Sequence, residues 1–105
     1  MKTQIESPHF KVEEKLSDHI EKKTATLDSH HTRIENCKVV LKLNKDSKNK
    51  NKLIELSINI PGSTLFAKEQ SESFEMATDL AIEKMKKQLE KHHQRPPHIS
   101  IDSEV

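Results

Sequence analysis

Residues 36–60 read NCKVVLKLNKDSKNKNKLIELSINI, and this stretch decides the fold. Apolar and polar residues alternate on both sides of a polar turn, as they do in strands that are buried on one face. The alternation predicts strands at Asn36–Lys45 and Lys52–Ile60, joined by the turn Asp46–Asn51. The side chains expected to face the core are Cys37, Val39, Leu41, Leu43, Ile54, Leu56, Ile58 and Ile60.

Two further strands and two helices are expected around this hairpin. Thr3–Glu6 is a short strand candidate, and Ser63–Glu69 follows the turn-forming pair Pro61-Gly62. Lys11–His31 and Ser71–Arg95 carry apolar residues at the spacing of amphipathic helices. The core side chains expected from the two helices are Leu16, Ile20, Leu27, Phe74, Ala81, Met85 and Leu89.

The order strand, helix, three strands, helix predicts one α+β domain built from two layers. Three consecutive antiparallel strands leave one face polar and one buried, and the two helices cover the buried face. Because the first helix makes a crossover, the first strand is expected to lie parallel to a neighbour. The domain is expected to span residues 1–95. Residues 96–105 are expected to form a flexible tail, or a short strand held by Ile99 and Ile101, since Pro96-Pro97 stops the last helix.

Composition excludes several classes of protein. The chain of 105 residues has one glycine, Gly62, which argues against a glycine-rich nucleotide-binding loop. No apolar run approaches the ~20 residues of a membrane span, and the start MKTQIESPHF lacks the apolar stretch of a secretory signal. Cys37 is the single cysteine, so no internal disulfide can form and a cytoplasmic setting is expected.

Neither catalysis nor metal binding is expected. No nucleophile motif surrounds Cys37, and no GxSxG is present. The histidine pairs His30-His31 and His92-His93 lack the spacing of zinc motifs, and neighbours on a helix point in different directions. A position near a helix end, where the dipole favours positive charge, explains these histidines better. We therefore expect a protein without enzyme activity, cofactor or metal.

Positive charge is concentrated locally in a nearly neutral chain. Lys and Arg number 18 against 17 acids, but residues 36–70 hold seven bases and three acids. In the last helix, Lys84, Lys87, Lys91 and Arg95 recur at spacings of three, four and four and form a stripe along one side. Such a row is typical of a phosphate-binding surface. A solvated helix whose charges match its dipole is the alternative interpretation.

Aromatic residues are scarce, since Phe10, Phe66 and Phe74 are the only rings. Proteins that bind single-stranded nucleic acid usually stack bases on exposed aromatic side chains. Because Phe74 is needed in the core, we expect any nucleic-acid contact to be made mainly with phosphates and overall shape.

Two segments, CKVVLKLNK (37–45) and AIEKMKKQLEKHH (81–93), resemble the ribosome hibernation-promoting factor family, which includes protein Y. The resemblance covers nearly the whole chain and implies a four-stranded sheet with two helices on one face, like a double-stranded-RNA-binding domain. It also implies a short form without catalytic activity. The implied partners are the small ribosomal subunit and its RNA, in the channel used by transfer RNA and messenger RNA, and the implied role is to silence idle ribosomes. No membrane and no small-molecule substrate are implied.

The resemblance further implies seven residues that contact ribosomal RNA. They are Lys23, Lys42, Lys45, Lys84, Lys87, Gln88 and Lys91. The last four follow the family's pattern Lys-x-x-basic-Gln-x-x-basic, which is the more specific part of the match. Thr26 and His93 depart from the family by replacing expected bases.

A second function, of another class, stays open. Members of the family have also been regarded as modulators of a transcription sigma factor, so the resemblance allows a regulatory module without ribosome binding. Such a module would bind a protein partner through the polar face of the sheet. Co-sedimentation with ribosomes at low and high salt separates the two hypotheses.

Overall fold

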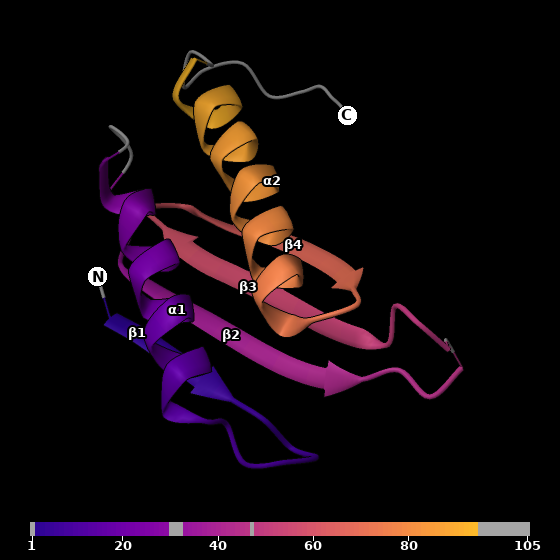
Figure 1. The fold of residues 1–105 in the computed structure, drawn as a ribbon. Coiled ribbons are helices and arrows are strands. Elements are labelled where there is room, and N and C mark those ends of the chain that lie inside the picture. The colour runs from indigo at the N-terminus through magenta and orange to yellow at the C-terminus, as the bar shows by residue number, and fades with distance from the viewer. Residues whose placement is uncertain (1, 30–32, 47, 95–105) are drawn as a thin grey trace.

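The computed structural model describes residues 2–29, 33–46 and 48–94, and its elements confirm the predicted α+β order (Figure 1). The strands are β1 (Lys2–Glu6), β2 (Asn36–Leu43), β3 (Lys52–Ile60) and β4 (Ser63–Ser71). The helices are α1 (Glu14–Ala25), which continues into a short 3-10 helix (Thr26–Ser29), and α2 (Phe74–Gln94).

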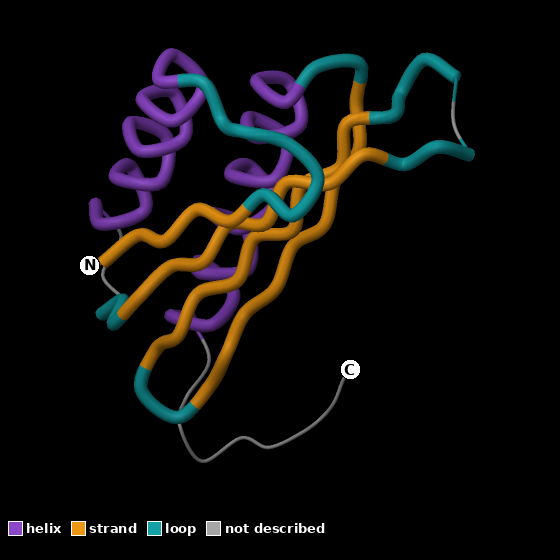
Figure 2. The backbone as a smooth tube through the Cα atoms, turned by 90° about the horizontal axis from the view of Figure 1, so that it is seen from below, coloured by secondary structure: helices purple, strands orange, loops and turns teal. Residues whose placement is uncertain are grey.

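The four strands form one mixed sheet in the order β1-β2-β3-β4. β1 lies parallel to β2, as the crossover through α1 predicts, and the other two pairs are antiparallel. Both helices lie against the same face of the sheet, and no described helix lies on the other face, which we call the uncovered face (Figures 1 and 2). Among the described strands, β4 is therefore an edge strand, with β3 as its one neighbour.

The core lies between the sheet and the two helices. Every core residue predicted for the helices is buried, and those predicted for β2 and β3 are buried except Leu43, which is half-buried. Ile34, Ala67 and Ile82 join the core although they were not among the predicted core residues. Thr78 is also buried, and its hydroxyl donates to the Phe74 carbonyl at 2.7 Å, so this buried hydroxyl has a partner.

The first helix is shorter than the predicted Lys11–His31. Phe10 lies before the helix, and its ring stacks on that of Phe74 with 5.0 Å between the ring centroids. Glu13 still has extended backbone geometry, with φ −71° and ψ 150°, so the first helical turn begins only at Glu14. The histidines at 30 and 31 lie outside the described residues.

The last helix begins at Phe74 because Ser73 caps it. The Met76 amide donates to the Ser73 hydroxyl oxygen at 3.1 Å, which satisfies one of the free donors at the helix start. Ser71, two residues earlier, is the last residue of β4. The tail expected at residues 96–105 lies outside the described part of the chain.

Candidate nucleic-acid interface

Four of the predicted contact residues lie on the flank of α2 that faces β4, and we call them the α2 stripe. They are Lys84, Lys87, Gln88 and Lys91. The Lys84 ammonium lies 2.8 Å from a carboxylate oxygen of Glu69, and the Gln88 side-chain amide donates to the Phe66 carbonyl at 2.7 Å. Since Glu69 and Phe66 both belong to β4, the stripe lies along the edge of the sheet.

Lys87 and Lys91 are the free cations of the stripe. Both side chains are exposed, and neither forms an ion pair with any other described residue. Helical spacing places them on the same side as Lys84, one and two turns further along. Their charges are therefore exposed to solvent. A contact with phosphate at such exposed positions requires little desolvation of the lysine.

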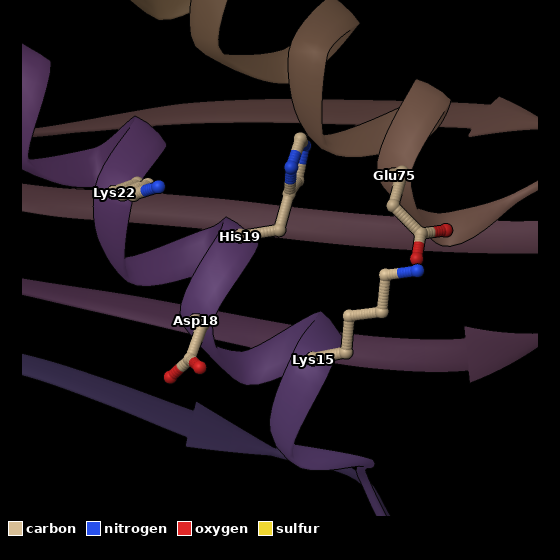
Figure 3. Close-up of a pocket in the computed structure, with 5 residues that line it drawn as sticks. All are labelled: Lys15, Asp18, His19, Lys22 and Glu75. Carbon is tan, nitrogen blue, oxygen red and sulfur yellow. The ribbon is translucent and has the colours of Figure 1, made fainter.

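Lys23 lies elsewhere, in the groove between the two helices. Its ammonium is 3.8 Å from Asp79 on α2, and the same carboxylate oxygen lies 3.0 Å from His19 Nε2. Beside this contact, a cavity of about 260 Å³ is lined by Lys15, Asp18, His19, Lys22 and Glu75 (Figure 3). The groove thus holds both signs of charge, and an acid already neutralises Lys23 in part.

Lys42 and Lys45 lie at the end of β2 nearest to the β2–β3 turn. Lys42 projects from the uncovered face of the sheet, 3.5 Å from a carboxylate oxygen of Glu55 on β3. Lys45 follows the strand in the turn and is exposed. The sheet separates Lys42 from Lys23, so the seven predicted residues do not form one patch.

The prediction missed Lys68, which brings a further cation to the β4 edge. Together with Lys84, it lines a shallow cavity of about 360 Å³ whose other walls are Leu53, Glu69 and Gln70. Parity along β4 could have found this residue, because Lys68 alternates with the buried Ala67 and must face away from the helices. The family resemblance described in the sequence analysis did not point to Lys68.

The structure gives no support for a reactive thiol. Cys37 is 1% exposed in the core, and burial raises the pKa of its thiol from 9.0 to about 12, with the negative charge of Asp28 adding to the rise. A nucleophilic cysteine needs the opposite shift. Among the described residues, no three His, Cys, Asp or Glu side chains gather into a potential metal site. Neither described helix has the length and apolar character that a membrane crossing needs.

Sequence comparison identifies the family. The family model described as Sigma 54 modulation protein / S30EA ribosomal protein matches residues 3–96, so the chain belongs to this family. A ribosome hibernation promoting factor of Pseudomonas putida is 30% identical over 95 residues, which cover 90% of this chain and 89% of that protein. A protein of the same name from Azotobacter vinelandii is also 30% identical over 95 residues, covering 90% of this chain and 85% of the relative.

Solved structures show the same fold. A ribosomal subunit interface protein from Coxiella burnetii aligns with a TM-score of 0.77 at 26% identity, covering 90% of this chain and all of that one. The N-terminal domain of Thermus thermophilus Protein Y aligns with a TM-score of 0.75, covering 88% of this chain and 99% of that one. At 23% identity, this second match supports the fold alone. A mixed sheet of four strands with two helices is therefore the fold of the ribosomal subunit interface proteins.

Proposed function

We propose that this protein is a cytoplasmic ribosome hibernation factor. It binds the small ribosomal subunit in the channel of transfer RNA and messenger RNA, and so blocks translation by idle ribosomes. The observation that carries the proposal is the α2 stripe, whose Lys87 and Lys91 are exposed and without an acidic partner among the described residues. The names of the two bacterial relatives, both ribosome hibernation promoting factors, support the same function.

Local charge explains how a nearly neutral chain could bind RNA. The net charge of +1 gives little long-range attraction, so binding depends on the cations that meet phosphates directly. Each phosphate neutralised by a lysine releases condensed counterions, which makes the affinity fall with salt. We assign this role to Lys84, Lys87 and Lys91 first, and to Lys23, Lys42 and Lys45 second. Residues 1–95 are the proposed ribosome-binding unit.

The proposed mechanism is occlusion without turnover. A domain seated in the channel excludes transfer RNA by volume, so it needs no cofactor, no metal and no catalytic residue. The inert, buried thiol of Cys37 is consistent with this mechanism. Inhibition should then follow the amount of protein bound to ribosomes.

Charge reversal on the α2 stripe tests the proposal. The variant carries Lys87→Glu and Lys91→Glu together with Lys84→Gln, because a glutamate at position 84 would face Glu69. Co-sedimentation with purified small subunits over a salt series should show weaker binding. The salt dependence should flatten by a slope of about 0.7–0.9 for each phosphate that the variant no longer neutralises.

The matched control changes charge on α1 and just before it. Lys15→Glu and Lys22→Glu with Lys11→Gln change the net charge equally at exposed positions away from the stripe. Circular dichroism should show that both variants are folded. If the stripe variant pellets with small subunits as the wild type does, the stripe is only a solvated helix face and the proposal loses its basis.

A regulatory module is the second candidate function. Two observations favour it: one face of the sheet is uncovered (Figure 2), and the matching family model is described in part by sigma 54 modulation. Such a module would bind a protein partner through the uncovered face. A wild-type protein that fails to pellet with ribosomes even at low salt would favour this alternative.

A further inference from the structure

The uncovered face of the sheet carries one exposed ring at the β4 edge. Phe66 is 52% exposed, and it is the only strongly exposed aromatic side chain among the described residues. The other two rings, Phe10 and Phe74, stack on one another and belong to the core region. Phe66 is therefore the one ring that a planar ligand can reach.

The strand holds Phe66 in a fixed position. Its carbonyl accepts a hydrogen bond from the Gln88 side chain on α2 at 2.7 Å, so the backbone of this edge residue is tied to the helix. Its register partner on β3 is Ser57, a small residue that leaves room above the sheet. A ring whose backbone is already ordered loses little conformational freedom when a ligand stacks on it.

The uncovered face that carries this ring holds charges of both signs. Alternation along the strands places the side chains of Lys38, Lys42 and Lys68 on the uncovered face, against Glu6 and Glu55. Lys38 and Lys42 each pair with one of these acids at 3.5 Å. Lys68, two residues along β4 from Phe66, lies opposite Glu55 in the register, but Glu55 pairs with Lys42 and Lys68 forms no ion pair with a described residue.

A shallow cavity lies where the β4 edge meets the α2 stripe. It measures about 360 Å³ and lies between Lys68 on β4 and Lys84 on α2, with Leu53 and Gln70 among its walls. Lys68 and Lys84 from two elements thus meet, with Glu69 between them in the cavity wall, at an edge of the sheet that no described strand covers.

We propose that the β4 edge binds a segment of single-stranded RNA, with one base stacked on Phe66 and a neighbouring phosphate between Lys68 and Lys84. The inference rests on the proposed ribosome-binding function and adds an unpaired RNA segment to it. Duplex RNA keeps its bases stacked on each other, so it cannot use the ring. A protein partner is less favoured, because Phe66 is the one large exposed apolar side chain that the described residues place on this charged face.

Fluorescence gives a direct readout of stacking. The chain has no Trp and no Tyr, so Phe66→Trp introduces a single indole whose emission reports only that position. Titration with short oligouridine or oligoadenosine should quench the emission in a saturable way that weakens with added salt. Duplex RNA of equal length should leave it unchanged. The control is Met76→Trp, because Met76 is 51% exposed on α2 but belongs to neither the ring nor the cavity.

Affinity measurements complete the test. Phe66→Ala should weaken oligonucleotide binding by about 5-fold to about 150-fold, the range for removing one stacked base, while Phe66→Tyr keeps the affinity. Lys68→Gln should lower the salt slope by about 0.7, the value for one phosphate of a single strand. Met76→Ala, the matched truncation, should change neither quantity.

The outcomes separate this inference from the proposed function. If the wild type pellets with small subunits while Phe66→Trp shows no quenching and Phe66→Ala binds normally, only the stacking site is wrong. If quenching occurs but the wild type does not pellet, the site stands and the ribosomal role falls. Loss of ribosome binding by Phe66→Ala without any oligonucleotide binding would indicate a protein contact and would overturn the inference.

Discussion

Lys84 on α2 and Glu69 on β4 form an ion pair across the sheet edge, with 2.8 Å between the ammonium nitrogen and the carboxylate oxygen. The Lys84 side chain is 53% exposed, so solvent screens the pair and its net contribution to stability is at most about 1 kcal/mol. For the proposed binding of RNA its consequence is larger, because a phosphate would have to compete with the Glu69 carboxylate for the Lys84 ammonium. Glu69 therefore acts as an internal competitor for this lysine.

Removing that competitor should strengthen binding to RNA. We expect Glu69→Gln to raise the affinity for small ribosomal subunits by about two-fold to five-fold, which corresponds to an exposed ion pair of about 0.4–1 kcal/mol. The salt dependence should steepen as Lys84 becomes free to neutralise a phosphate. Binding curves over a salt series measure both effects.

Glu21→Gln is the control for net charge. Glu21 is exposed on α1 and forms no ion pair with a described residue, so its removal changes total charge without freeing a stripe lysine. An equal gain from both variants would show that only net charge matters. An unchanged or lower affinity for Glu69→Gln would contradict the competitor role.

Gly62 should be replaceable only at a cost in stability. It follows Pro61 in the two-residue turn between β3 and β4 and has φ +79°, which a type II turn requires at its third position. A Cβ there would meet nothing within 4 Å, so backbone strain alone sets the cost. We expect Gly62→Ala to lower the free energy of unfolding by about 1–2 kcal/mol in urea denaturation. Ser63→Ala, at the exposed next position, should be nearly neutral.

The thiol of Cys37 should make the fold sensitive to alkaline pH. Burial raises its pKa from 9.0 to about 12 in the folded protein. Between these values the unfolded chain releases the thiol proton while the folded chain keeps it, so the unfolded state binds fewer protons and unfolding becomes easier as pH rises. Below pH 9.0 the thiol is protonated in both states, so its contribution to the free energy of unfolding is fully present. Above pH 9.0 this contribution falls by at most about 1.4 kcal/mol per pH unit.

Comparison with Cys37→Ala isolates this effect from lysine titration. The variant loses some packing at every pH, but it has no thiol to ionise. The difference in unfolding free energy between wild type and variant should therefore shrink from pH 9.0 upward. A difference that stays constant over that range would show that the thiol is already able to ionise in the folded protein.

The sequence predicted the architecture because two periodicities were clear. In β3, Ile54, Leu56 and Ile58 alternate with polar residues and are all buried. Element ends were harder to predict, because tertiary contacts decide them. The Phe10 ring packs on Phe74 before α1 begins, and the pattern of Val12 and Leu16 alone carries no sign of that contact.

The site was predicted less completely than the fold. Spacing along one helix identified Lys84, Lys87 and Lys91 as neighbours, since all three belong to one element. Whether Lys42 lies near them depends on which face of the sheet the helices cover. Periodicity within one element does not show how two elements are placed relative to each other. Scarcity of aromatics favoured contact mainly through phosphates and overall shape, and composition alone could not show that the ring of Phe66 is exposed.

The measurement that tests the central claim most directly is a titration of cell-free translation with the purified protein, in extract from the source organism. Occlusion without turnover predicts inhibition that rises in proportion to the protein and is complete near equimolar ratio to ribosomes. Excess initiator transfer RNA with initiation factors should relieve it, and added salt should weaken it. Complete inhibition at a small fraction of the ribosome concentration would indicate catalysis and would contradict the account, as would no inhibition at several-fold excess.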